Sequence, residues 1–152
     1  LNTQMGPMFT TWLRNKFELL NIVDFQESTE GIFVLSSTEE EEGKFFVNEI
    51  LNQNLSKRPD LVAKVNTTYI VGEAKWIGRS GGNQNNQVRD VLDFCRDQRG
   101  DVIRVGIIDG FPWATRKINN SIINDKVAVV VQEFPYDIIS ALLLQEYLNS
   151  FL

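Results

Sequence analysis

The chain has 152 residues, of which 43% are hydrophobic and 23% are charged, and its net charge at pH 7 is −5. This length and composition predict one folded domain that buries about two-thirds of the surface exposed by its unfolded chain. Histidine is absent and Cys95 is the single cysteine, which excludes histidine-dependent catalysis, disulfides within the chain and multi-cysteine zinc sites.

The first third of the chain predicts a helix, a strand and a second helix. Apolar residues in the segment 8–20 have the spacing of a helix that packs on a core. The short apolar run 31–35 predicts a strand. Thr38 and Glu41 have the spacing of a capping box, and the glutamates around them favour the first turn of a helix that is expected to end near residue 54.

The middle of the chain predicts a β-hairpin that is followed by a helix. Residues 59–65 and 69–77 are two strand-like runs, and the turn between them covers only 66–68. A glycine-rich loop at 78–82 then leads into a helix that is expected to cover about 83–99.

The last third completes the predicted sheet. The runs 102–108 and 127–131 are typical of strands buried in the middle of a sheet. Between them, 114–124 predicts a short helix, and 138–152 predicts a closing helix. The run 31–35 is expected to join the same sheet, so the fold class is α/β, with a mixed central sheet flanked by helices on both faces.

Charged residues meet at one end of the predicted hairpin. Glu73 and Lys75 share a face of their strand, and pairing across the turn places Asp60 beside them. Two carboxylates this close repel each other unless a cation joins them, and with no histidine available the cation expected is a hard metal such as Mg²⁺. The lysine is then placed to orient a water that attacks phosphorus. The alternative is a solvated ion pair, although charges on a strand with apolar neighbours are uncommon.

The same residues carry a resemblance to a known family. Pro59-Asp60, followed by Glu73-Ala74-Lys75 at the end of an apolar strand, resembles the motif of the PD-(D/E)XK nucleases. This likeness implies a restriction-endonuclease-like core. A closer similarity to type II restriction endonucleases covers about residues 58–113 and rests on the runs 72–77, 81–84 and 107–113 and on Gln87.

The resemblance implies a role for each matching residue. Asp60 and Glu73 would bind Mg²⁺, for which Mn²⁺ would substitute, and the carbonyl of Ala74 would be a further ligand. Lys75 would hold the attacking water near the scissile phosphate. Gln84 would bind that phosphate or support the lysine, and satisfying the backbone of the preceding loop is its alternative role.

Further candidates surround this group. Many such nucleases add a carboxylate from the helix before the motif, and Glu49 is the best match, with an ordinary surface glutamate as the alternative. Arg79, Gln87, Arg89 and Lys117 are candidate contacts to DNA. For the three cations, the alternative is a surface charge without a role.

Positive charge is concentrated in the middle of the chain. Residues 57–117 carry eleven Lys and Arg against seven Asp and Glu, whereas 1–56 carry three against nine and 118–152 carry one against four. The middle segment would attract DNA phosphates despite the acidic total. An ordinary mixed surface is the alternative.

These observations predict a Mg²⁺-dependent type II endonuclease that cuts double-stranded DNA to 5′-phosphate and 3′-hydroxyl ends. Cutting both strands requires two sites, so a homodimer or a heterodimer with another nuclease subunit is expected. The alternatives are a structure-specific repair or junction-resolving nuclease, and a non-catalytic DNA- or protein-binding module. Residues 1–152 are expected to form a single nuclease domain. Because the chain begins at Leu1, this domain is expected either to stand alone or to be a fragment or one subunit of a larger restriction enzyme. Without an apolar run of about 20 residues, the cytoplasm is the expected location, and the resemblance to restriction endonucleases implies a prokaryotic one.

Overall fold

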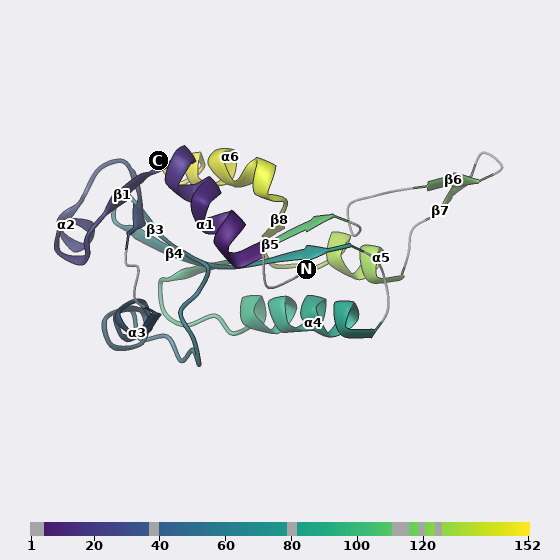
Figure 1. The fold of residues 1–152 in the computed structure, drawn as a ribbon, viewed down its shortest axis with the longest axis horizontal. Coiled ribbons are helices and arrows are strands. Elements are labelled where there is room, and N and C mark those ends of the chain that lie inside the picture. The colour runs from purple at the N-terminus through teal and green to yellow at the C-terminus, as the bar shows by residue number, and fades with distance from the viewer. Residues whose placement is uncertain (1–4, 37–39, 79–81, 111–115, 119–120, 124–125) are drawn as a thin grey trace.

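Six strands form one mixed sheet with helices on both of its faces (Figure 1). The computed structural model describes residues 5–36, 40–78, 82–110, 116–118, 121–123 and 126–152. The helices are α1 (Met5–Lys16), α2 (Ile22–Glu27), α3 (Glu40–Phe45) with a π-helical turn at Phe46–Ile50, α4 (Gly82–Arg96), α5 (Lys126–Gln132), a 3₁₀ turn at Ala141–Leu143, and α6 (Leu144–Asn149). The strands are β1 (Glu18–Leu20), β2 (Ile32–Leu35), β3 (Leu61–Val65), β4 (Thr68–Ile77), β5 (Ile103–Gly110), β6 (Arg116–Ile118), β7 (Ser121–Ile123) and β8 (Ile138–Ile139).

The strand order in the large sheet is β1-β2-β3-β4-β5-β8, and β6 pairs with β7 in a separate two-stranded sheet. Strands β2, β3 and β4 are antiparallel, whereas β4, β5 and β8 are parallel. The hairpin β3–β4 turns tightly at Asn66, whose φ of 53° lies in the left-handed region that asparagine tolerates. The α/β class, the hairpin and the participation of β2 in the sheet are therefore as the sequence predicts.

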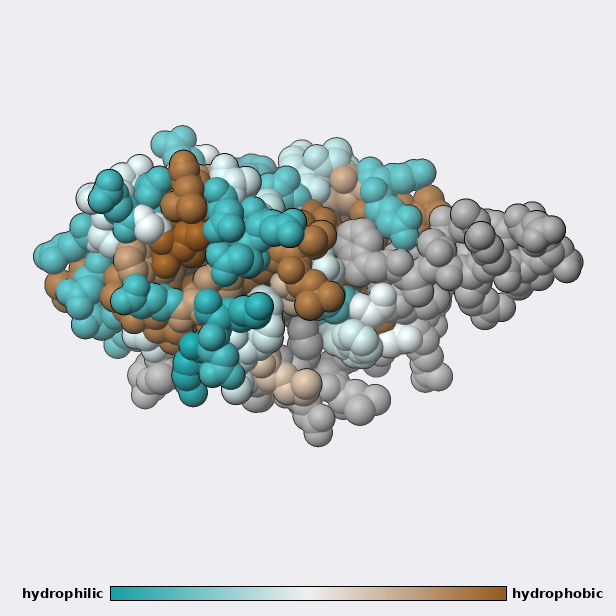
Figure 2. Space-filling view, turned by 90° about the horizontal axis from the view of Figure 1, so that it is seen from above, coloured by the Kyte–Doolittle hydropathy of each residue, from teal (hydrophilic) through white to brown (hydrophobic). Residues whose placement is uncertain are grey.

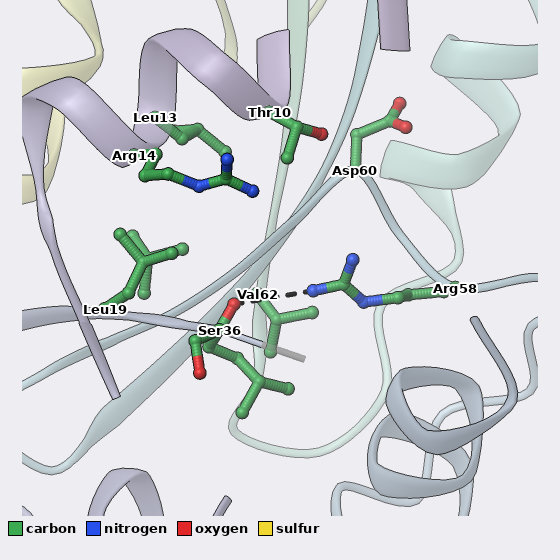
Figure 3. A pocket seen from close by; sticks show the side chains of 10 residues that line it. Thr10, Leu13, Arg14, Leu19, Ser36, Arg58, Asp60 and Val62 are labelled. Carbon is green, nitrogen blue, oxygen red and sulfur yellow. Dashed lines mark hydrogen bonds between the residues drawn. The ribbon is translucent and has the colours of Figure 1, made fainter. Parts of the chain in front are cut away.

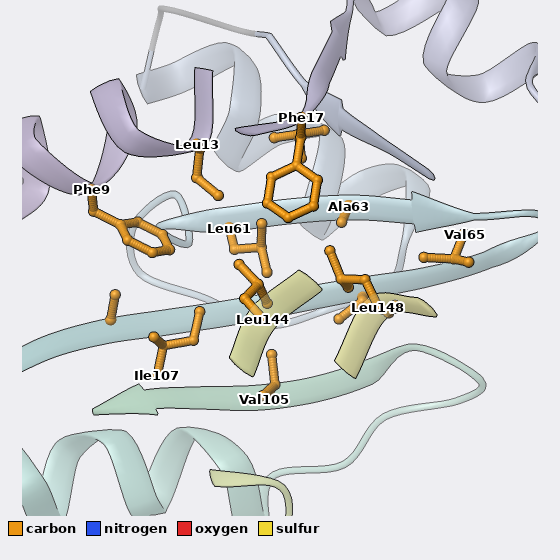
Figure 4. Close-up of a cluster of buried hydrophobic side chains, with 13 residues drawn as sticks. Phe9, Leu13, Phe17, Leu61, Ala63, Val65, Val105, Ile107, Leu144 and Leu148 are labelled. Carbon is orange, nitrogen blue, oxygen red and sulfur yellow. The ribbon is translucent and has the colours of Figure 1, made fainter. Parts of the chain in front are cut away.

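Helices α1 and α6 cover one face of the sheet, where the largest group of buried apolar side chains lies (Figure 4). Leu13 and Phe17 reach down from the N-terminal segment, and Leu144 and Leu148 from α6. They pack on side chains from the inner strands, which include Ile107 of β5. Burial of this face anchors the two ends of the chain on the sheet.

The opposite face is shared by two helical segments. The π-helical turn packs Phe46 and Val47 on the antiparallel half of the sheet. Helix α4 packs Val88 and Val91 on the parallel half, where Ile108 is fully buried. Strand β4 therefore packs against both segments, through Val71 and Ile77, and Asp60 lies directly before the first residue of its partner strand β3.

Gly106 of β5 lies directly beneath α4, and a Cβ atom there would lie 2.4 Å from Ile138 Cδ1 and 2.7 Å from Val91 Cγ1. Gly106→Ala is therefore expected to lower the free energy of unfolding by about 1–3 kcal/mol, because overpacking forces the helix away from the sheet. Urea unfolding measures the change. Gly78→Ala, whose Cβ has its nearest neighbour at 3.6 Å, is the matched control and should unfold like the parent. Equal stability of both variants would contradict the close packing of α4.

Figure 2 views the face that α1 and the C-terminal helices cover, where apolar patches lie among polar side chains. Met8 of α1 and Leu142 of the 3₁₀ turn are among the exposed large apolar residues of the protein. In the part of the chain that the structure describes, no helix is both long and apolar enough to cross a membrane.

Two predicted elements in the C-terminal third are wrong in type. The run 127–131 lies within helix α5 and not in a strand, and the place beside β5 belongs to β8. A short apolar run does not distinguish a buried strand from a buried helix, and here Val131 packs in the cluster of α4. The sequence predicts a helix at 114–124, but the described residues of this segment form β6 and β7.

Other boundaries differ from the predicted ones. The first helix ends at Lys16, and the remaining residues of 8–20 form β1. The closing helix begins only at Leu144, because the start of 138–152 pairs with β5 as β8. The predicted capping residue Thr38 lies outside the described residues.

Candidate functional site

The charged residues predicted from the sequence lie at the open end of the β3–β4 hairpin. Leu61 and Gly72 are the last residues that pair across the hairpin. Asp60 stands one residue earlier, and its Oδ2 accepts a hydrogen bond of 2.9 Å from the backbone N–H of Ala74. The N–H and carbonyl of one strand residue point to the same edge, so the carbonyl of Ala74 lies on the side of Asp60.

Glu73 is the most buried acidic residue near this point, with only 8% of its surface exposed. Burial, followed by the negative charge of Asp60, raises the pKa of Glu73 to about 7. The positive charges of Lys57 and Lys75 oppose this shift but do not cancel it. The surrounding protein groups therefore stabilise the negative charge of the Glu73 carboxylate only in part.

Lys57 is the closest cation to this carboxylate, and sequence analysis missed it. Its Nζ lies 3.4 Å from Glu73 Oε2, and about half of its side chain, 52%, is exposed. Burial alone would lower the pKa of Lys57, but the charges of Glu73 and Asp60 raise it overall. A lysine just before the Arg58-Pro59-Asp60 run was the only available signal in the sequence.

A cavity of about 260 Å³ opens beside these residues, between the segment before β3 and helix α4. Glu73 and Lys75 of β4 line it, together with Lys57 and with Asp90 of α4. No hydrogen bond or ion pair to another described residue holds the Nζ of Lys75. The ammonium group of Lys75 is thus available to a molecule that enters this cavity.

The donor set suits a hard divalent cation. Asp60 keeps one carboxylate oxygen outside its bond to the backbone. Burial and the charge of Asp60 raise the pKa of Glu73, so a cation bound between the two carboxylates would stabilise its charged form. Carboxylate and backbone carbonyl oxygens are the ligands that Mg²⁺ prefers. Asp60, Glu73 and the carbonyl of Ala74 would hold it.

The structure does not bring Glu49 into this group. Glu49 lies exposed on the π-helical turn. Among the described residues, no cluster of three or more acidic, histidine or cysteine side chains could hold a metal. A third carboxylate from the preceding helix is therefore not supported.

The structure places the remaining candidates only in part. Gln84 lies in the first turns of α4 and Lys117 in β6, but their side chains are outside the described set, as is all of Arg79. Arg89 is exposed on α4. The Oε1 of Gln87 is buried and has no hydrogen-bond partner among the described residues. This oxygen can therefore accept a hydrogen bond from a molecule that binds beside α4.

Comparison with known protein families identifies a match over almost the whole chain. The family model described as Tsp45I type II restriction enzyme matches residues 1–151. No curated protein and no solved structure matches the chain. The matched region includes α1 and α6, which lie outside the segment that carries the motif resemblance.

Proposed function

The chain belongs to the Tsp45I family of type II restriction enzymes, and from this premise we propose a Mg²⁺-dependent endonuclease that cuts double-stranded DNA to 5′-phosphate and 3′-hydroxyl ends. The observation that carries the proposal is the meeting of Asp60, Glu73 and Lys75 at the end of the β3–β4 hairpin. The cavity beside Lys75 supports it, because a phosphodiester can approach the ammonium group there.

Each residue has a distinct part in the proposed reaction. Asp60 and Glu73 hold the metal, and Mn²⁺ is expected to replace Mg²⁺ with the same ligands. The bound metal supplies positive charge that stabilises the charge developing on the phosphate in the transition state. Lys75 donates a hydrogen bond that orients the attacking water. Lys57 offsets part of the negative charge of Glu73 while no metal is bound.

Incubation of plasmid DNA with the protein in Mg²⁺, in Mn²⁺ and in EDTA tests the proposed function. Discrete fragments are expected with either metal and none in EDTA. Cuts only at junctions or flaps would indicate a structure-specific nuclease, and absence of cleavage with both metals would indicate a binding module. Because both strands must be cut, the proposed active form is a homodimer or a heterodimer with another nuclease subunit, in the prokaryotic cytoplasm as part of a restriction system.

Asp60→Asn is expected to remove most of the stabilisation that Mg²⁺ gives the parent, because a ligand stabilises only the fold that binds it. In EDTA the melting temperature should stay unchanged or rise slightly. The amide oxygen can still accept the bond from Ala74, and one of two repelling charges is gone. Thermal melts in EDTA and in Mg²⁺ measure both effects, with the exposed Glu49→Gln as a control that keeps the Mg²⁺ response. A destabilised Asp60→Asn variant with an intact Mg²⁺ shift would exclude Asp60 as a ligand.

A further inference from the structure

A second cavity, of about 240 Å³, lies between α1 and the first strands of the sheet, and Asp60 is part of its wall. Figure 3 shows two arginine side chains that reach into it from opposite sides, Arg14 from α1 and Arg58 from the segment before β3. Asp60 also belongs to the carboxylate pair of the candidate metal site. Asp60 therefore links this cavity to the candidate metal site, whose Glu73 lines the cavity described above.

Arg58 carries a positive charge that the described residues compensate only weakly. Its Nη2 donates one long hydrogen bond of 3.4 Å to the carbonyl of Leu35. Its Nε is buried without a hydrogen-bond partner, and no carboxylate of the described residues lies within ion-pair distance. Burying a cation without a partner costs free energy unless another charge arrives. Asp60, Glu42 and Glu40 attract this charge only from beyond ion-pair distance, so an anion that enters the cavity would be its nearest charged partner.

Arg14 faces the same cavity with an exposed guanidinium. None of the described residues forms an ion pair or hydrogen bond with it. Two planar guanidinium groups that converge from opposite walls match the oxygens of a phosphate, which can accept paired hydrogen bonds from each fork. A single anionic group between them would compensate both charges at once.

Gly43 of α3 fixes the position of the Arg58 side chain. A Cβ atom at Gly43 would lie 2.3 Å from both Cδ and Nε of Arg58. The absence of a side chain at this point therefore lets α3 lie directly against the arginine. A glycine inside a helix costs stability, and this close approach explains its presence.

We propose that this cavity binds one backbone phosphate of the DNA strand, next to the scissile phosphate, and that Arg14 and Arg58 bind it together. The inference rests on the proposed function, because Asp60 ties the cavity to the site where the strand is cut. A strand that places one phosphate beside Glu73 and Lys75 passes Asp60 and presents a neighbouring phosphate to the two arginines.

The salt dependence of DNA binding tests this proposal. Anisotropy of a fluorescent duplex is measured in EDTA, where no cleavage occurs, over a series of KCl concentrations. Arg14→Gln and Arg58→Gln should each weaken binding roughly tenfold, as expected for loss of a charge-assisted contact, and lower the salt slope by about 1. The double variant should also lose about 1, because both arginines hold the same phosphate. Arg99→Gln, a surface arginine paired with Asp97, is the control and should bind like the parent.

Three outcomes would overturn the proposal. Single variants with the slope of Arg99→Gln would exclude a phosphate contact, and a loss of about 2 in the double variant would mean two separate phosphates. The third outcome is a thermal shift of the DNA-free parent by millimolar inorganic phosphate that both arginine variants lack, while their affinity for DNA equals that of the parent. This result would assign the cavity to free phosphate.

Gly43→Ala keeps both charges but displaces Arg58, so it should weaken DNA binding if Arg58 is a ligand. If the parent cuts plasmid DNA while the arginine variants bind normally, only this inference fails, whereas a parent that neither binds nor cuts removes the proposed function.

Discussion

Glu73→Gln is expected to abolish cleavage and, above pH 7, to raise the stability of the metal-free protein. The carboxyl is buried beside Asp60, and its pKa rises from an ordinary 4.5 to about 7 in the folded protein. Between these values the folded chain binds more protons than the unfolded chain, so stability falls as the pH rises and the loss is complete above pH 7. Glutamine has no proton to release in this pH range, so the variant does not undergo this loss of stability.

The variant and the parent should therefore be nearly equal in stability at pH 4, below the ordinary pKa of 4.5, where Glu73 is mostly protonated in both the folded and the unfolded chain. At pH 8 the variant should be more stable, on the order of 3 kcal/mol for a shift of this size. Urea unfolding in EDTA at both pH values measures the difference, and the exposed Glu49→Gln is the matched control without a pH-dependent effect. Lower stability of Glu73→Gln at pH 8 would mean that Lys57 fully compensates the carboxylate, and the candidate metal site would lose its main support.

Lys75→Ala is expected to slow cleavage by a factor of about 10² to 10⁴, the usual contribution of a group that assists proton transfer. Binding of Mg²⁺ should persist, because Asp60 and Glu73 are unchanged, and so should DNA binding. Single-turnover cleavage and the Mg²⁺-induced thermal shift separate these two effects. Lys44→Ala, on α3, removes a lysine outside the candidate site and should cut normally. A Lys75→Ala enzyme that cuts at the parent's rate would exclude the proposed role in orienting water.

The candidate site was largely predictable from local sequence. The turn between the two runs is short, so β3 and β4 have only one reasonable pairing, and that pairing brings Asp60 beside Glu73. Alternation along β4 then places Lys75 on the face of Glu73. Lys57 and Arg58 were not predictable as partners of the site, because the loop that carries them has no periodic pattern from which to infer a direction.

Arg104 illustrates what a local pattern does not reveal. It lies inside the run 102–108, whose apolar residues predict a buried strand, and it is 2% exposed in β5. Its guanidinium is held by Gln53 Oε1, at 2.9 and 3.1 Å, and by the carbonyl of Phe94 at 2.8 Å. A buried charge of this kind depends on a partner 51 residues away, and only the tertiary fold brings the two together.

The two outermost strands of the large sheet are short. Strand β1 has three residues and β8 has two, whereas a long unpaired edge is what recruits a strand from another molecule. Backbone hydrogen bonds along such short edges would contribute little to the association of two chains. Continuation of one subunit's sheet into the next is thus a poor way to assemble this enzyme, and any pairing needed for cutting both strands should depend on side-chain contacts between helices or loops.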